Sequence, residues 1–171
     1  MKHESKQRNT PDNETAIDYL TYHKKSSVRL HLAKRMSYNL TLRSRVEFSF
    51  FNTDQQEEIE HGYLLYQDII YSFPRFPLRL SGRFAIFETD SYDNRLYAYE
   101  NDVLYAFSVP AYSGKGTRMY LLANYKFSRS FEAWARWSQF YYPDRETIGT
   151  GLEEIDGNRK SEVKVQVRVR F

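Results

Sequence analysis

The chain has 171 residues, of which 41% are hydrophobic and 17% aromatic, with 25 Lys and Arg, 22 Asp and Glu and no cysteine. This length suits one domain or one piece of a larger one. The aromatic content excludes a disordered polymer, and the missing cysteine excludes a disulfide scaffold, a thiolate zinc site and a cysteine nucleophile. The mean hydropathy of −0.72 excludes a transmembrane helix but not membrane-spanning strands, which alternate polar and apolar residues.

The apolar residues recur with a period of two from Ser26 to the end of the chain, as expected for strands and not for helices. Residues 1–25 are polar and charged, and we expect a tail or linker there, ahead of a β-barrel domain at residues 26–171. In chain order, the pattern predicts strands at residues 26–35, 40–50, 62–73, 78–86, 95–109, 117–127, 131–142 and 161–171. About eight strands separated by turn residues predict an all-β sandwich or barrel.

The last predicted strand alternates most strictly. Valines occupy every second position from Val163, and Phe171 ends the chain, while polar residues fill the positions between them. This segment resembles the C-terminal β-signal of bacterial outer-membrane barrels, which the barrel assembly machinery reads. The resemblance implies an assembly signal formed by Val165, Val167, Val169 and Phe171. The alternative is a soluble edge strand that ends in phenylalanine.

Charged residues occupy the opposite face of the predicted strands. A Lys or Arg facing the middle of a bilayer costs about 2–4 kcal/mol, so these side chains are expected in a polar lumen. The expected lumen charge network consists of Arg43, Arg45, Glu47, Arg79, Arg83, Glu132, Arg136, Glu162, Lys164, Arg168 and Arg170.

The connections between predicted strands give a mixed result. Outer-membrane barrels alternate short periplasmic turns with longer outer loops. Residues 143–160, 128–130 and 111–116 follow this alternation from the C-terminus backwards, but residues 54–61 and 74–77 depart from it. Tyrosine and tryptophan near strand ends are typical of a membrane interface, although tyrosine also favours strands in general.

Two longer segments, residues 94–122 and 147–171, resemble the C-terminal barrel region of a family of large outer-membrane proteins. Members of this family often carry an N-terminal helix-hairpin-helix domain. The resemblance implies that this chain is a C-terminal fragment of such a protein. Neither DNA binding nor a catalytic residue is inferred for this chain from the resemblance.

We therefore expect an antiparallel transmembrane β-barrel of about eight strands, or the C-terminal strands of a larger barrel, in the bacterial outer membrane. The expected partners are the lipid bilayer and the barrel assembly machinery, with no nucleic acid bound through this segment and no prediction of oligomeric state. The expected role is structural anchoring or passive transport, without catalysis, cofactor or metal.

Two alternatives stay open. One is a soluble lipocalin-like barrel that binds a small apolar ligand and encloses Leu80, Phe84, Ile86 and Val165. The other is an outer-membrane hydrolase, for which Ser27 or Ser44 with His31 has no supporting motif.

Overall fold

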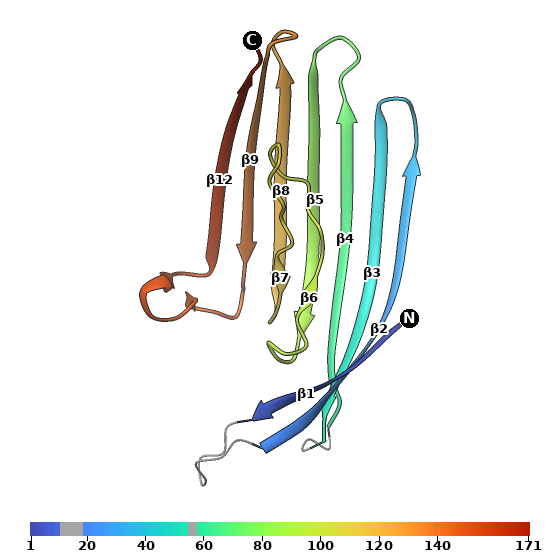
Figure 1. The fold of residues 1–171 in the computed structure, drawn as a ribbon, viewed down its shortest axis with the longest axis vertical. Coiled ribbons are helices and arrows are strands. Elements are labelled where there is room, and N and C mark those ends of the chain that lie inside the picture. The colour runs from blue at the N-terminus through green and yellow to red at the C-terminus, as the bar shows by residue number, and fades with distance from the viewer. Residues whose placement is uncertain (11–18, 55–57) are drawn as a thin grey trace.

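The computed structural model describes residues 1–10, 19–54 and 58–171, and in this part of the chain the protein is an all-β structure (Figure 1). Eight strands form one antiparallel sheet in the order β1-β2-β3-β4-β5-β8-β9-β12. These strands are β1 (Lys2–Thr10), β2 (Tyr19–Arg35), β3 (Leu40–Thr53), β4 (Glu60–Ser72), β5 (Leu78–Thr89), β8 (Gly116–Lys126), β9 (Phe131–Tyr141) and β12 (Arg159–Val169).

Two of the connections contain short elements of their own. β6 (Leu96–Tyr97) pairs with β7 (Ala111–Tyr112), and β10 (Thr147–Ile148) pairs with β11 (Ile155–Asp156) near the 3₁₀ turn η1 (Gly151–Glu153). No helix in the described residues is both long enough and apolar enough to cross a membrane.

The sheet is antiparallel, as predicted, but it is not closed. Among the described strands, β1 and β12 each have a neighbour on one side only, so the sheet has two free edges. An unpaired strand leaves backbone N–H and C=O groups available to another strand.

The two faces of the sheet differ in what covers them. Residues 90–115, which we call the covering loop, run back over one face between β5 and β8 (Figure 1). We call that face the loop-covered face and the other the bare face. Large apolar side chains are exposed on the bare face: Val28, Leu30, Leu32, Phe48, Phe50, Leu65, Ile69, Phe84, Ile86, Leu121, Trp137, Val163, Val165, Val167 and Val169.

A small apolar core lies between the covering loop and the centre of the sheet. Leu96 and Tyr112 of the loop pack against Leu64 of β4 and Phe87 of β5, all of them buried. The rings of Phe87 and Tyr112 meet edge to face with centroids 5.3 Å apart. The core therefore fixes the loop on the sheet while leaving the bare face uncovered.

The prediction of a strand at residues 95–109 was wrong. Only Leu96–Tyr97 is a strand there, and it pairs with β7, not with the main sheet. The segment nevertheless alternates, because Leu96, Ala98 and Glu100 are buried against the sheet while the residues between them are exposed. A period of two reports an extended segment with one buried face, whether or not it joins the sheet.

The predicted tail at residues 1–25 also differs from the structure, because it contains β1 and the first part of β2. Residues 2–10 of β1 pair with residues 19–27 of β2. Both faces of β1 are polar, with Glu4 and Lys6 on one and Ser5 and Gln7 on the other. This pattern carries no apolar alternation, which is why the sequence did not indicate a strand.

Because residues 95–109 are not a strand of the main sheet, the connections between its strands are short at one end of the sheet and long at the other. The turns at residues 36–39, 73–77 and 127–130 are short and lie at the end of the sheet that holds the C-terminus (Figure 1). The long connections at residues 90–115 and 142–158 lie at the opposite end. Residues 54–61 and 74–77 depart from the alternation only if residues 95–109 form a strand of the main sheet, which they do not.

Candidate functional site

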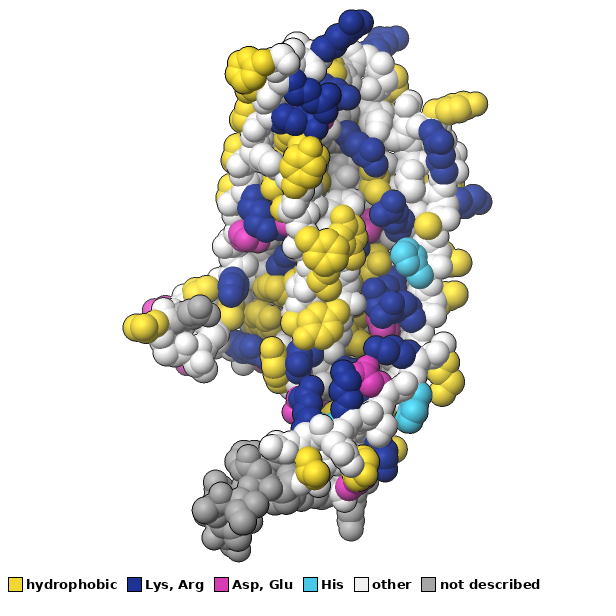
Figure 2. All heavy atoms as spheres, in the orientation of Figure 1, with side chains coloured by type: hydrophobic (Ala, Val, Ile, Leu, Met, Phe, Trp, Pro, Cys, Tyr) yellow, Lys and Arg dark blue, Asp and Glu magenta, His cyan; other side chains and the backbone are white. Residues whose placement is uncertain are grey.

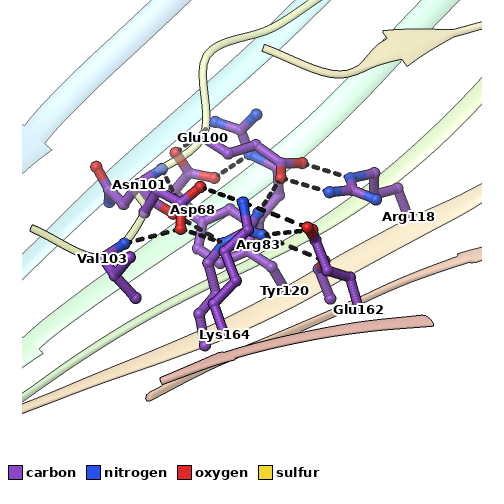
Figure 3. A network of polar contacts seen from close by, with 12 residues as sticks. Asp68, Arg83, Glu100, Asn101, Val103, Arg118, Tyr120, Glu162 and Lys164 are labelled. Atoms are coloured by element: carbon purple, nitrogen blue, oxygen red, sulfur yellow. Dashed lines mark hydrogen bonds and ion pairs between the residues drawn. The ribbon is translucent and has the colours of Figure 1, made fainter. Parts of the chain in front are cut away.

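A cluster of ion pairs lies beneath the covering loop, and Glu100 of that loop is at its centre (Figure 3). The Glu100 side chain is fully buried. Arg118 of β8 donates two hydrogen bonds to it, each 2.8 Å long, and Arg136 of β9 donates another. The Tyr112 hydroxyl donates a fourth at 2.9 Å. One carboxylate of the loop thus holds two arginines from neighbouring strands.

The next residues of the loop extend the cluster toward β12. Lys164 Nζ of β12 lies 2.9 Å from Asp102 Oδ2, and Arg136 Nε lies 3.7 Å from Asp102 Oδ1. Arg136 also donates a hydrogen bond of 3.1 Å to the Asn101 carbonyl. The Asn101 N–H in turn donates to the Tyr120 hydroxyl over 3.4 Å (Figure 3). The loop is therefore tied to β8, β9 and β12.

A second ion pair belongs to the sheet itself. Arg83 of β5 donates two hydrogen bonds, of 2.6 and 2.8 Å, to the carboxylate of Asp68 on β4. Both side chains are buried, and the Arg83 guanidinium stacks 3.6 Å from the centre of the Tyr66 ring. Paired, bidentate arginines of this kind compensate for part of the cost of removing charge from water.

The start of the covering loop is held by the N-terminal strands. Arg45 of β3 donates to the Tyr97 carbonyl over 3.2 Å, and Lys25 of β2 donates to the Arg95 carbonyl over 2.7 Å. The loop is thus attached to strands on both sides of the sheet centre.

The electrostatics of the loop follow from its burial. Burial raises the pKa of the Tyr112 hydroxyl above its ordinary value, and the nearby Glu100 carboxylate raises it further. Like an ordinary tyrosine, Tyr112 is protonated at neutral pH, and its hydroxyl donates a hydrogen bond to Glu100.

Members of the expected charge network lie on the loop-covered face. Arg45, Glu47, Arg83, Arg136 and Glu132 are buried there. Arg168 pairs with Glu132, while the half-exposed Glu162 lies 3.5 Å from Arg136 and 3.4 Å from Lys164. Arg43, Arg79 and Arg170 form no side-chain hydrogen bond or ion pair with any described residue.

The central carboxylates of the cluster were missed in the sequence. Glu100 and Asp102 lie within residues 95–109, where the alternation predicts a spanning strand and no site. Asp68 pairs in register with Arg83 across β4 and β5. An acid on the polar face of one predicted strand opposite an arginine on the next is a signal that could have found it.

The residues of the expected assembly signal lie along β12 and just beyond it. Val165 is 71% exposed and Val167 and Val169 are each 52% exposed, all on the bare face. Phe171 follows the end of the strand and is fully exposed. Recognition of this segment by the assembly machinery stays a prediction.

The cluster is built to hold the loop in place. Glu100 and Asp102 are bound by guanidinium or ammonium groups of β8, β9 and β12. No group of three or more His, Cys, Asp or Glu among the described residues is arranged to hold a metal ion.

Comparisons with family models, with curated proteins and with solved structures find no match to this chain. The resemblance to helix-hairpin-helix-bearing outer-membrane proteins therefore stays a prediction.

Proposed function

We propose that this chain forms the wall of an outer-membrane-type β-barrel, with the bare face against lipid and the loop-covered face toward a polar lumen. Its role is to anchor the protein or to line a passage for solutes, without catalysis. The chain would then be folded into the bacterial outer membrane by the barrel assembly machinery.

The observation that carries the proposal is the reversed burial of the two faces. Val165 on the bare face is 71% exposed, whereas the Arg136 side chain on the loop-covered face is fully buried. In water, a contiguous apolar surface of this extent marks an interaction site or an aggregation hazard. In a bilayer, the same surface is the expected lipid contact of a spanning strand.

The strand lengths and connections support the same arrangement. β5, β8, β9 and β12 contain 12, 11, 11 and 11 residues. About 9–11 residues of tilted strand cross the hydrocarbon core of a bilayer. The short turns lie at the end of the sheet that holds the C-terminus, and the long connections lie at the opposite end (Figure 1). In outer-membrane barrels the short turns are periplasmic and the long loops face outward.

The open edges set a condition on this proposal. β1 and β12 would have to be joined, directly or through further strands, because the hydrocarbon core of a bilayer offers no water to unpaired backbone groups. Eight strands closed on themselves would leave an interior just filled by side chains, whereas a wider barrel would leave a passage beside the covering loop.

The proposal is tested by folding the chain with and without lipid. We expect it to precipitate or aggregate in plain buffer, and to fold in detergent micelles or phosphatidylcholine vesicles with a migration on gels that changes on heating. The exposed bare face is the physical reason for this dependence on detergent. A folded, monodisperse protein in detergent-free buffer would contradict the proposal.

The soluble lipocalin-like alternative requires an enclosed apolar cavity. Of the residues expected to line it, Phe84, Ile86 and Val165 are exposed on the bare face, at 48%, 45% and 71%. The same folding experiment distinguishes the two, since only the soluble barrel is stable without detergent.

A further inference from the structure

A pocket of about 410 Å³ lies on the loop-covered face at the end of the sheet that carries the long connections. β1 and β2 form one wall, β3 forms the floor, and residues 93–97 of the covering loop form the other wall. Its size falls within the range of small-molecule sites. The ion-pair cluster around Glu100 is separate from it, since neither Glu100 nor its partners line the pocket.

The lining has an excess of positive charge. Six Lys and Arg side chains and three carboxylates line the pocket, which leaves three positive charges uncompensated. The cationic lining residues are Lys2, Lys6, Arg8, Lys25, Arg29 and Arg95. Figure 2 shows the face that carries this pocket, with Lys and Arg side chains spread over the strands on either side of the covering loop.

Each of the three carboxylates is shared between two cations. Glu4 binds Lys2 and Lys6, and Asp93 lies 3.2 Å from Arg8 and 3.6 Å from Arg95.

The third carboxylate, Glu47, binds Arg29 at 2.8 Å and also Arg45. Arg45 does not line the pocket, so within the lining the two cations on Glu4 and the two on Asp93 each leave one positive charge uncompensated, on β1 and on the covering loop.

Two further groups lack an ionic partner among the described residues. Lys25 is half-buried and donates only to the carbonyls of Arg95 and Asp93, at 2.7 and 3.5 Å. His23 also lines the pocket, and its Nδ1 is buried with no hydrogen-bond partner in the described part of the chain. Phe51 and Leu96 add an apolar surface to the lining.

We infer that this pocket binds a small organic polyanion, carrying a phosphate or several carboxylates, at the mouth of the lumen. The pocket opens on the loop-covered face, away from the bare face, so the ligand is a dissolved solute and not a lipid headgroup. Binding itself does not depend on the proposed function, but the role of the site in capturing solutes for passage rests on it.

The affinity should depend on pH through Lys25. Burial lowers the pKa of Lys25 to about 8, and the positive charge of Arg95 contributes to this shift. The other charged groups that face Lys25 are Glu47 of β3 and Glu4 and Lys2 of β1. A lowered lysine pKa means that the ammonium is charged below about pH 8 and neutral above it. Anion binding should therefore weaken between pH 7 and pH 9.5.

The test is calorimetric titration of the whole chain, folded in phosphate-free detergent, with citrate and with pyrophosphate. We expect one ligand per chain, and an affinity at least tenfold lower in the double variant Lys2→Gln and Lys6→Gln, whose side chains are exposed. The control is Arg43→Gln with Arg79→Gln, which removes the same charge from the same face outside the pocket and should leave the affinity unchanged.

The pH dependence of the affinity is measured with citrate. We expect this dependence to be absent in Lys25→Met. No measurable binding, or an equal loss in the pocket variant and its control, would overturn the inference. Each variant is also scored for heat-modifiable folding in vesicles, so a chain that inserts but does not bind separates failure of the site from failure of the proposed function.

Discussion

Replacing Glu100 by alanine is expected to lower the free energy of unfolding by about 3–5 kcal/mol, the range observed when one partner of a buried ion pair is removed. The variant would leave the guanidinium groups of Arg118 and Arg136 beneath the covering loop without their shared carboxylate. It would also remove the acceptor of the Tyr112 hydroxyl. Glu100→Gln keeps the shape and one acceptor oxygen and should lie between the two.

Urea unfolding in detergent micelles, followed by the fluorescence of Trp134 and Trp137, measures this change. The control is Glu88→Ala: Glu88 is 40% exposed, its pair with Lys115 at 3.5 Å is a surface pair worth less than about 1 kcal/mol, and it accepts one hydrogen bond, of 3.1 Å, from the Tyr63 hydroxyl. Similar losses for Glu100→Ala and Glu88→Ala would show that the cluster does not hold the loop.

Arginine at Leu121 is expected to destabilise the membrane-inserted chain by about 2–4 kcal/mol, the cost of an arginine near the bilayer midplane. Leu121 is half-exposed on the bare face of β8, near the centre of the sheet, and is flanked in register by Gly82 and Trp137. Nothing on that face offers the guanidinium a carboxylate among the described neighbours.

The stability of folded chain in phosphatidylcholine vesicles, read from heat-modifiable migration across a urea series, measures the effect. Ser5→Arg is the matched control, because Ser5 is exposed on the same face of β1, where the neighbouring side chains are polar. If Leu121→Arg were as stable as Ser5→Arg, the bare face would not contact lipid.

The sequence predicted seven of the eight strands of the main sheet, because each of those seven carries apolar side chains at most of its alternate positions. The strands at residues 40–50 and 161–171, for example, lie within or overlap β3 and β12. The remaining strand, β1, lies in a region taken as a tail, since a strand that packs no apolar face shows no period of two. Sequence periodicity identifies a strand that has one apolar face. It does not identify a strand such as β1, which pairs with its neighbour but has polar side chains on both faces.

The candidate site was predicted in part. Its arginines stand on regular strands, so the alternation places Arg83 and Arg136 on the polar face directly. Its central carboxylates lie on the covering loop, whose path over the sheet is set by long-range packing of Leu96 and Tyr112. No local pattern distinguishes such a loop from a strand, and the pocket beside β1 depends on that same path.

The most direct test of whether the bare face contacts lipid is a cysteine scan along β12. The scan needs no background substitutions, because the chain has no cysteine of its own. Single cysteines at Val163, Val165, Val167, Glu162 and Gln166 would carry a fluorophore in chain folded into vesicles that contain brominated lipid. We predict strong quenching at the three valine positions and little at the two polar ones. Equal quenching at all five, or stronger quenching at Glu162 and Gln166, would contradict the assignment of the bare face to lipid.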